Sequence, residues 1–357
     1  MKVALLHNLR PTERPGEGPD DLYEEYDCVE TIEAVRAALA PLGVVAIPVP
    51  ADRRLAHRLE EGSYEFVFNL AEGAGRRCRE AVPAAICELL GLPFTGSDVL
   101  TLAVALDKAV AKRVVSPEVP VPCGVLVEPE ADFEQISLPP FPAIVKPNDE
   151  GSSKGIRGQP IVQDRTALRE YSCRLHQDYG CPVLVEEFLP GTEVTVGVLG
   201  NGARSRIIGM MEIGPAQAEP QFVYSLEVKR DWRNRARYHI PPRLPASTLA
   251  WIEELALTAY RLLGCRDCAR LDFRLDAAGT PRFIECNPLP GLNPESGDLV
   301  LLARPTFSYP QLIQGIFHEA VARVGQRLPL EPAATVCSAA TPFARTFPTV
   351  IFPSYSK

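Results

Sequence analysis

The sequence has no long apolar segment. None of its 357 residues belongs to a run approaching the roughly 18 apolar residues that a membrane-spanning helix needs. The first residues are also unlike a secretion signal, because the apolar stretch Met1–Leu6 is short and a polar run, Asn8–Pro11, soon follows it. We therefore predict a cytoplasmic protein with no membrane partner.

A basic surface is missing as well. The chain carries 37 Lys and Arg against 45 Asp and Glu, a formal net charge of -8, and no Lys/Arg cluster long enough to follow a nucleic-acid backbone. This balance argues against nucleic-acid binding and favours small-molecule partners. The sequence leaves open whether the chain is a monomer or a homodimer.

A second cysteine pair is also absent. Among ten cysteines, only Cys265 and Cys268 have the CxxC spacing of a metal or redox site, and no other pair completes a zinc site. Most of the others have apolar neighbours, as Cys87 and Cys286 do, which is typical of small core side chains. We favour structural cysteines over a CxxC site.

Apolar strands and helices alternate in the first 115 residues. We predict strands at 2–6, 44–48 and 64–69, and helices at 29–40, 80–90 and 99–114. Such alternation is typical of a parallel α/β unit. Residues 1–115 are therefore predicted to form an N-terminal α/β domain.

The rest of the chain divides into two smaller units and a tail. After a proline-rich connection, the pattern predicts a strand at 143–146, a helix at 165–177 and strands at 182–188 and 193–199. A helix at 246–263, a strand hairpin and a helix at 310–324 follow. We predict a central subdomain at 116–190, a C-terminal subdomain at 191–327, and a tail at 328–357 without an assigned role.

The segment 269–287 predicts a β-hairpin with an unusual face. Its first strand alternates charged and apolar residues, 276–279 is a turn cluster, and the return strand ends at Asn287. Centring the hairpin between Ala278 and Gly279 places Asp272 opposite Glu285 and Arg270 opposite Asn287. Opposed side chains lie about 5 Å apart at Cβ.

Two facing carboxylates repel unless a positive group lies between them. With the amide oxygen of Asn287, Asp272 and Glu285 form a set of hard oxygen donors of the kind that suits magnesium. The alternative is a surface hairpin with ordinary charges.

A glycine- and serine-rich loop follows the strand at 143–146. It runs from Lys146 to Gly155, and such loops let backbone N–H groups approach a phosphate. Lys146 would add a positive charge. The spacing differs from the GxxxxGK[ST] loop, because the lysine precedes the glycines. A flexible loop without a ligand is the alternative.

Further along, Glu186 and Glu187 end an apolar strand, and Glu193 follows six residues after Glu187. Acids at such a position can hold an adenine edge or ribose hydroxyls, although a solvated strand end has the same appearance. Lys108 lies on the predicted helix 99–114, where a lysine usually faces solvent.

Together these segments resemble the ATP-grasp superfamily, and within it the D-alanine–D-alanine ligases. The matching stretches are ELLGLPFTGSD with ALDKAVAK, VKPNDEGSSKG, VEEFLPGTEVTV and GCRDCARLDFRLDAAGTPRFIECNPLPGLNPES. They occur in family order across most of residues 80–300. The resemblance implies an α/β fold with α+β parts, built from three subdomains, with ATP held between the central and C-terminal ones.

The resemblance also implies a role for each matching residue. Lys108 and Lys146 match phosphate-contacting lysines. The loop over the phosphates matches Glu150, Gly151, Ser152, Ser153 and Gly155, and the adenine and ribose contacts match Glu186, Glu187, Leu189 and Glu193. The ligands of two magnesium ions, which manganese could replace, match Asp272, Glu285 and Asn287, with Glu285 bridging. The groups that act on the reacting atoms match Arg270, the backbone N–H of Gly291, Lys229 and, in the substrate network, Ser152.

The chemistry implied is acyl activation. A substrate carboxylate attacks the terminal phosphate of ATP to give an acyl phosphate and ADP, and the amine of a second substrate then displaces phosphate to form an amide. The protein positions the reactants and neutralises the charge of the transferring phosphoryl group.

The departures from the family concern the substrates. Either Glu24 or Glu25 occupies the position of the amine-binding glutamate, and the register does not decide between them. Arg230 stands where the family has tyrosine, and Ser296 is followed by glycine where the family has a Ser-Leu pair. A buried arginine needs an anionic partner, so we expect Arg230 to contact an anion on a substrate larger than alanine.

We therefore predict an ATP-dependent ligase that joins two amino-acid-like substrates other than two D-alanines. The alternatives are a D-alanine–D-alanine ligase of cell-wall synthesis, a kinase acting on a carboxylate or hydroxyl, and a non-catalytic nucleotide-binding protein. The sequence names neither the substrates nor their stereochemistry.

Overall fold

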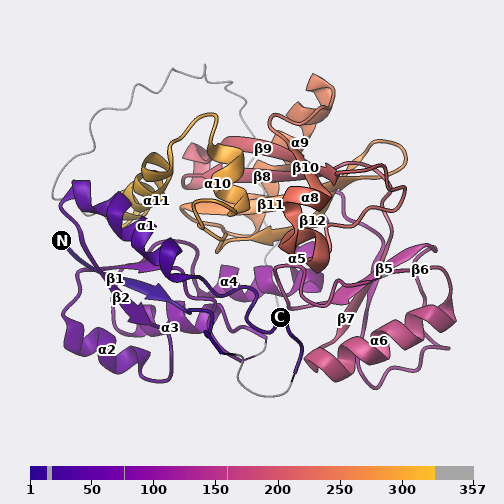
Figure 1. Cartoon of the computed structure of the whole chain (residues 1–357), viewed down its shortest axis with the longest axis horizontal. Helices are drawn as coiled ribbons and strands as arrows, with labels where there is room; N and C mark the ends of the chain where they lie inside the picture. The colour runs from indigo at the N-terminus through magenta and orange to yellow at the C-terminus, as the bar shows by residue number, and fades with distance from the viewer. Residues whose placement is uncertain (14–17, 76, 159, 326–357) are drawn as a thin grey trace, which may run out of the picture.

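The computed structural model describes residues 1–13, 18–75, 77–158 and 160–325. Over these residues the chain forms one parallel and two antiparallel sheets, each with its own covering helices (Figure 1). The predicted tail, 328–357, lies outside the described residues. The predicted subdomain boundaries at 115 and 190 fall between the sheets but stay predictions.

The N-terminal sheet has the predicted parallel arrangement, in the order β2-β1-β3. Its elements are β1 (Lys2–His7), α1 (Val29–Leu39), η1 (Ala40–Leu42), β2 (Val45–Pro50), α2 (Leu55–Gly62), β3 (Phe66–Asn69) and α3 (Ala81–Leu89). The sequence pattern missed α2 and η1. Every residue of β3 is buried, which explains why its sequence reads as one apolar run.

The helix predicted at 99–114 is two helices, α4 (Val99–Leu106) and α5 (Lys108–Val115). Asp107 separates them with a non-helical backbone (ψ 96°). Its carboxylate accepts the backbone N–H of Val110 at 3.0 Å and so caps α5. Lys108 is therefore the first residue of a helix, not a residue within one.

The central sheet is antiparallel, in the order β4-β7-β5-β6. Its strands are β4 (Gly124–Val127), β5 (Ala143–Pro147), β6 (Ile161–Val162) and β7 (Val183–Glu187), and α6 (Arg165–Tyr179) covers one face. Leu168 and Leu175 of α6 pack against Val145 and Val185 in a small separate core. The opposite face of this sheet is left for the site.

The largest sheet is antiparallel, in the order β10-β9-β8-β11-β12. Its strands are β8 (Glu193–Leu199), β9 (Arg206–Pro215), β10 (Ala236–His239), β11 (Cys268–Leu275) and β12 (Pro281–Asn287). The remaining elements are η2 (Gly202–Arg204), α7 (Leu226–Arg230), α8 (Trp232–Arg235), α9 (Ala246–Leu262), α10 (Asp298–Ala303) and α11 (Tyr309–Arg323). The pattern missed β9, β10 and α10, and it took α7 for a loop.

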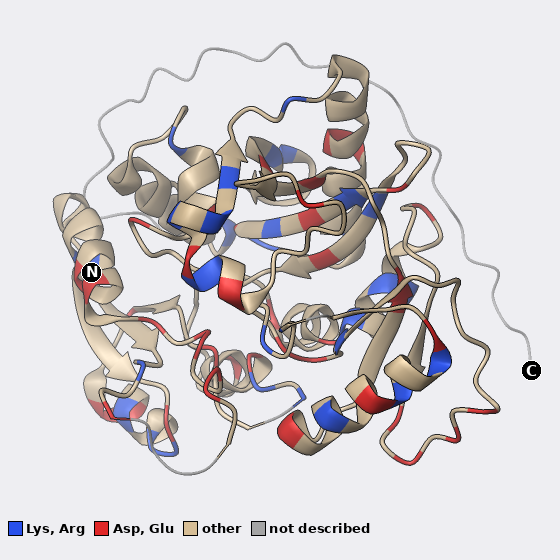
Figure 2. Ribbon diagram, turned by 45° about the vertical axis from the view of Figure 1, so that its right-hand side comes forward, with Lys and Arg blue, Asp and Glu red and all other residues tan. Residues whose placement is uncertain are grey.

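Alternation along the strands of this sheet decides which residues reach the site. Val194 and Val196 of β8 and Leu271 and Phe273 of β11 are fully buried in the core beneath α9. The residues between them point to the opposite face, because successive side chains of a strand alternate. Figure 2 shows charges of both signs along these strands.

The hairpin pairs Asp272 with Glu285 and Arg270 with Asn287, as the sequence predicts. The predicted turn centre is wrong, however: near the turn, Phe273 pairs with Phe283, one residue out of the predicted register. A β-bulge beyond Asp272 restores the register toward Asn287. Its effect is that the consecutive residues Ile284 and Glu285 both line the same cavity.

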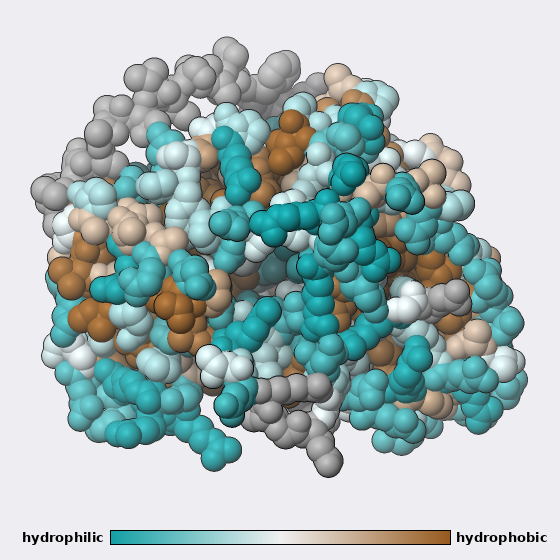
Figure 3. Space-filling view, viewed as in Figure 1, coloured by the Kyte–Doolittle hydropathy of each residue, from teal (hydrophilic) through white to brown (hydrophobic). Residues whose placement is uncertain are grey.

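The helices and the surface can be compared with the expectation for a membrane protein. Among the described residues, no helix is both long and apolar enough to cross a membrane. The face in Figure 3 is mostly hydrophilic around a hollow near its middle, with apolar residues in small scattered patches.

Candidate active site

Two cavities meet where the three sheets converge. The inner cavity, about 110 Å³, lies between the central sheet and the largest sheet. The outer cavity, about 550 Å³, opens beside it toward the N-terminal domain. The residues that line both are Lys108, Gly151, Ser152, Tyr224, Lys229, Arg270, Glu285 and Asp298. Most of these carry charge or belong to the glycine loop.

Two buried lysines share one glutamate beside the inner cavity. Glu186, only 1% exposed, lies 2.6 Å from the Nζ of Lys112 and 2.8 Å from that of Lys146. Burial alone would raise the pKa of Glu186, but the two lysines lower it. Burial lowers the pKa of Lys112 to about 7 against the opposing effect of Glu186. Two lysine side chains therefore share one carboxylate beside the inner cavity.

Lys108 reaches the junction of the cavities from the first turn of α5. Its Nζ donates to the backbone carbonyl of Glu150 and lies 3.4 Å from the carboxylate of Glu285. It therefore links the glycine loop to the hairpin. With Lys146, it provides the positive charge that the sequence assigns to a phosphate site.

The loop 151–155 holds an uncommon backbone conformation. Ser152, Ser153 and Gly155 have φ of 50°, 58° and 73°, in the left-handed region. Successive turns of this kind present backbone N–H groups to an anion. At Gly155 a Cβ would lie 2.6 Å from Pro147, so both the conformation and the space require glycine there.

The strand-end acids Glu186, Glu187 and Glu193 lie beside the inner cavity, and all three have protein partners. Glu187 accepts the backbone N–H of Cys123 at 2.8 Å. Glu193 pairs with Arg274 at 3.1 Å, and burial still raises the pKa of Glu193 to about 7. Together with Leu189, they line the inner cavity. Their nucleotide contacts stay predictions.

The hairpin carries the acids of the predicted magnesium site into the cavities. Arg270 pairs with Asp272 at 2.9 Å and lies 3.7 Å from Glu285. Burial raises the pKa of Asp272, whereas Lys108 and Arg270 overcome burial and hold the pKa of Glu285 at about 2. Asn287 uses its side-chain oxygen to accept the N–H of Leu289.

These residues fit a divalent cation. Asp272 and Glu285 face each other across the hairpin, and each already attracts cationic side chains. Carboxylate and amide oxygens are the donors that magnesium prefers. The assignment of metal to this set remains a prediction.

Of the two candidate amine-binding glutamates, Glu25 reaches the glycine loop. It accepts the N–H of Gly151 at 2.7 Å and pairs with Arg79 and Lys154, each at 2.8 Å. These cations overcome burial and hold the pKa of Glu25 at about 2. Glu24 instead pairs with Arg230. Both line the outer cavity, but neither is without a protein cation.

Lys229 and Arg230 end α7 over the junction of the cavities. Lys229 donates to the hydroxyl of Ser152 at 3.3 Å. The sequence predicts an anionic substrate group for Arg230, but the structure supplies protein carboxylates: Asp20 and Glu24, each at 2.7 Å. The contact of Arg230 with a substrate anion stays a prediction.

The loop after the hairpin supplies the remaining predicted residues. Gly291 and Ser296 both line the outer cavity. The hydroxyl of Ser296 bonds to Asn293 at 3.0 Å, and Asn293 also bonds to Thr31 of α1 at 3.1 Å. Asn293 therefore ties this loop to the N-terminal domain. The roles of Gly291 and Ser296 stay predictions.

Sequence reasoning missed several side chains of the site. Lys112 lies four residues after Lys108, a helical spacing that could have revealed it. Asp298 pairs with Arg270 at 3.1 Å and lines both cavities, although no local pattern marks it. Arg79 and Lys154 became visible only through their shared contact with Glu25.

Comparison with known proteins agrees with this geometry. A family model described as the D-ala D-ala ligase C-terminus matches residues 128–318. A D-alanine–D-alanine ligase of Pelotomaculum thermopropionicum is 30% identical over 337 residues, covering 92% of this chain and 99% of the relative. Another, of Albidiferax ferrireducens, is 33% identical over 292 residues and covers 81% of each chain.

Solved structures show the same fold. The D-alanine–D-alanine ligase of Bacillus anthracis complexed with ATP superposes with a TM-score of 0.67 at 20% identity, covering 90% of this chain and 98% of the other. The VanG D-Ala:D-Ser ligase of Enterococcus faecalis gives 0.67 at 22%, covering 90% and 99%. The sequence matches and the shared fold show that this chain belongs to the D-alanine–D-alanine ligase-like family of ATP-grasp enzymes.

Proposed function

We propose that this protein is an ATP-dependent ligase that joins two amino-acid-like substrates through an acyl phosphate. The observation that carries the proposal is the meeting of the two cavities at Lys108, Ser152, Lys229, Arg270 and Glu285. The inner cavity has Lys108, Lys146 and Lys229 on its wall, and lysine side chains suit phosphates. The outer cavity, about 550 Å³, lies within the usual size range of small-molecule sites.

The side chains at the junction of the two cavities would have separate roles in binding phosphate and in stabilising the reacting groups. Lys146 and Lys108 hold phosphate oxygens by direct charge, and the loop 151–155 covers them with backbone N–H groups. Lys229, tethered to Ser152, meets the terminal phosphate as it transfers. Arg270, held by Asp272 and Asp298, then stabilises the oxyanion formed when the amine attacks the acyl phosphate.

Magnesium bound by Asp272, Glu285 and Asn287 would neutralise the phosphate oxygens between which charge moves. The protein's own contribution is position. The hairpin register sets Glu285 beside Lys108, and the bulge sets Ile284 beside it on the wall of the inner cavity.

We further propose that the substrates are not two D-alanines. Tyrosine of the family is replaced by Arg230, and the structure ties this residue to Asp20 and Glu24 at the edge of the outer cavity. Glu25, a candidate for amine binding, is occupied by Arg79 and Lys154. Arg230 and Glu25 both line the outer cavity, whereas the residues assigned to ATP and metal match the family.

A screen of ADP release over pairs of amino acids, with mass detection of the product, tests both proposals. A ligase releases ADP only when both substrates are present, and the product mass equals their sum less one water. ADP release with one substrate and no amide would indicate a kinase. No ADP release with any pair would favour a nucleotide-binding protein.

D-Alanyl-D-alanine synthesis is the second candidate function. The observation that favours it is that relatives named D-alanine–D-alanine ligase cover up to 92% of this chain among those compared. Formation of D-alanyl-D-alanine faster than any other product of the screen would establish it and overturn the substrate proposal.

A further inference from the structure

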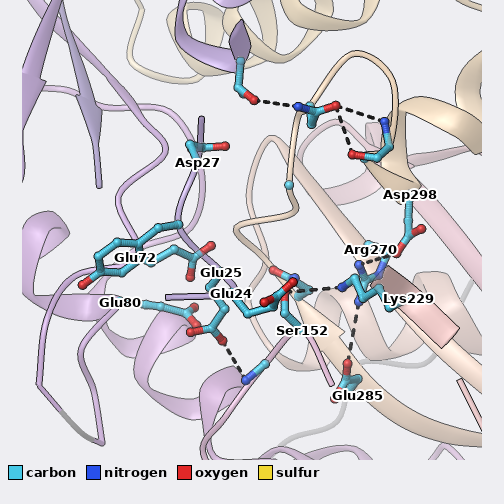
Figure 4. A pocket seen from close by; sticks show the side chains of 18 of the residues that line it. Glu24, Glu25, Asp27, Glu72, Glu80, Ser152, Lys229, Arg270, Glu285 and Asp298 are labelled. Atoms are coloured by element: carbon cyan, nitrogen blue, oxygen red, sulfur yellow. Dashed lines mark hydrogen bonds and ion pairs between the residues drawn. The ribbon is translucent and has the colours of Figure 1, made fainter. Parts of the chain in front are cut away.

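Three carboxylates of the outer cavity stand apart from the rest. They are Asp27, Glu72 of the loop after β3, and Glu80 at the start of α3, and we call them the acidic wall. Carboxylate oxygens of Glu72 and Glu80 lie within 4.8 Å of each other and of Glu25. Figure 4 shows Glu72 and Glu80 beside Glu25, with Ser152 and Arg270 across the cavity.

Every other acid lining this cavity has a cationic partner. Glu24 pairs with Arg230, Glu25 with Arg79 and Lys154, Glu285 with Lys108, Glu295 with Arg233, and Asp298 with Arg270. Within the described part of the chain, the acidic wall forms no ion pair and its carboxylates accept no hydrogen bond.

Glu80 is the one buried member of the acidic wall. The residue is only 7% exposed, and it lines the cavity without an ion-pair or hydrogen-bond partner for its carboxylate in the described structure. Burying a carboxylate without a hydrogen-bond or ion-pair partner costs free energy, because the lost hydration is not replaced. Arg79 is adjacent in sequence, but it points its guanidinium at Glu25 and the carbonyl of Asp149 instead.

The number of unpaired carboxylates indicates the charge of the ligand. The α-ammonium of an amino acid supplies one positive charge, and three unpaired carboxylates face the cavity. The cations near enough to act on Glu80 are Arg79, Lys108 and Lys154, and they already pair with Glu25, Glu150 and Glu285. A second cationic group on the ligand would pair with the carboxylates that the α-ammonium leaves unpaired.

Building on the proposed function, we infer that one substrate is a basic amino acid whose side-chain ammonium or guanidinium binds between Glu72 and Glu80, with Asp27 nearby. Burial raises the pKa of Glu80 to about 7 and that of Glu72 well above its ordinary value. Without substrate, the carboxylates of Glu80 and Glu72 are therefore partly protonated. A bound substrate cation would replace these protons. The same cavity would then reject neutral side chains of equal length, since they leave the buried Glu80 unpaired.

The test compares each basic amino acid with a neutral counterpart. Lysine is paired with norleucine and arginine with citrulline, in both D and L forms, each with ATP, magnesium and a varied second amino acid. We expect the basic member to have a KM lower by about ten- to a hundredfold, as a charge-assisted contact of about 1.5–3 kcal/mol implies. Equal KM values for basic and neutral members would overturn the inference while leaving the ligase activity intact.

Variants separate recognition from structure. Glu80→Gln and Glu72→Gln keep the side-chain shape and should remove the preference for the basic member, with the KM for ATP unchanged. Glu88→Gln makes the same change on the exposed side of α3 and should preserve the preference. Thermal unfolding of all three checks the fold. Retained preference in both wall variants would count against the inference.

A binding measurement keeps the inference distinct from the proposed function. If no pair yields an amide, calorimetry of lysine and arginine with the protein saturated with ADP and magnesium still reports on the wall. Binding that is lost in Glu80→Gln supports the inference without ligation, and no binding overturns it. If Glu80→Gln removes a site for Mn²⁺ alone and leaves amino-acid binding unchanged, the wall is a metal site and the inference is wrong.

Discussion

The charged residues beside the inner cavity form a cluster of buried ion pairs. Lys112 and Lys146 share Glu186, and Lys108 approaches Glu285. Burying a cation is costly unless a partner offsets the lost hydration. One carboxylate for two lysines leaves the offset incomplete, and a phosphate group would complete it.

Replacement of Lys146 should therefore weaken nucleotide binding. We expect Lys146→Ala to lower the affinity for ATP by about ten- to a hundredfold, because a charge-assisted contact contributes roughly 1.5–3 kcal/mol. Isothermal calorimetry with magnesium measures this. Arg169→Ala, which removes an exposed charge from α6, is the control and should bind ATP normally. Unchanged affinity in Lys146→Ala would defeat the phosphate assignment.

The hairpin acids should control metal dependence. Glu285→Gln keeps the size of the side chain but removes the charge that faces Asp272, so we expect ADP release to fall by orders of magnitude and to need more magnesium. Asn287→Ala should act in the same direction. Glu254→Gln, on the exposed side of α9, should change neither. Near-normal ADP release in both hairpin variants would show that the metal lies elsewhere.

At the scale of elements, the break between α4 and α5 places a functional lysine. Asp107 caps α5 and also accepts the side-chain amide of Asn148 at 2.8 Å, beside the glycine loop. Asn148 in turn accepts the N–H of Ala109 at 3.0 Å. The first turn of α5 and the loop after β5 are therefore held together by one polar cluster.

Asp107→Ala should cost both stability and nucleotide affinity. Loss of a helix cap costs about 0.5–2 kcal/mol, and the loop would also lose its anchor. Asp164→Ala is the matched control, because Asp164 caps α6 in the same way at 2.9 Å, outside both cavities. Denaturant unfolding should show a loss in both variants, and calorimetry should show weaker ATP binding in Asp107→Ala alone. Equal ATP affinities would mean that the cap has no role in the site.

Some helices and strands were predictable from the pattern of apolar residues, and others were not. Apolar periodicity located β1, β3, α6 and α9 within a few residues, because burial of one face dictates it. It missed β9, whose buried residues do not alternate regularly along the strand, and it merged α4 with α5, because a capping aspartate has no periodic signature. The hairpin pairing of Asp272 with Glu285 was predicted correctly from a wrong turn centre, since a bulge compensated the error.

For the whole molecule, the acidic wall should shape the dependence of stability on pH. The pKa of Glu80 and that of Asp27 are each raised by burial to about 7. The folded protein therefore holds these protons more tightly than the unfolded chain does, and the stability they contribute is complete below the unfolded pKa. It is lost as the pH rises through about 7.

We expect the free energy of unfolding to fall between about pH 5 and pH 8, by on the order of 2–3 kcal/mol for Glu80 alone. Chemical denaturation across this range, without substrate, measures the fall. Glu80→Gln should flatten the profile, and the exposed Glu88→Gln should leave it as steep as in the unmodified protein. A profile that Glu80→Gln does not alter would show that Glu80 is ionised throughout.

The sequence by itself determined the family and predicted the residues of the ATP and metal sites, because these lie in short contiguous segments whose spacing the chemistry restricts. Only the tertiary structure decided how the substrate cavity is built. Glu25 meets Arg79 and Lys154, and Arg230 meets Asp20, across separations of 54 to 210 residues. Such pairs produce no periodic pattern in the sequence. The sequence therefore could not show which carboxylates pair with a cation and which, like Glu80, form no ion pair within the described structure.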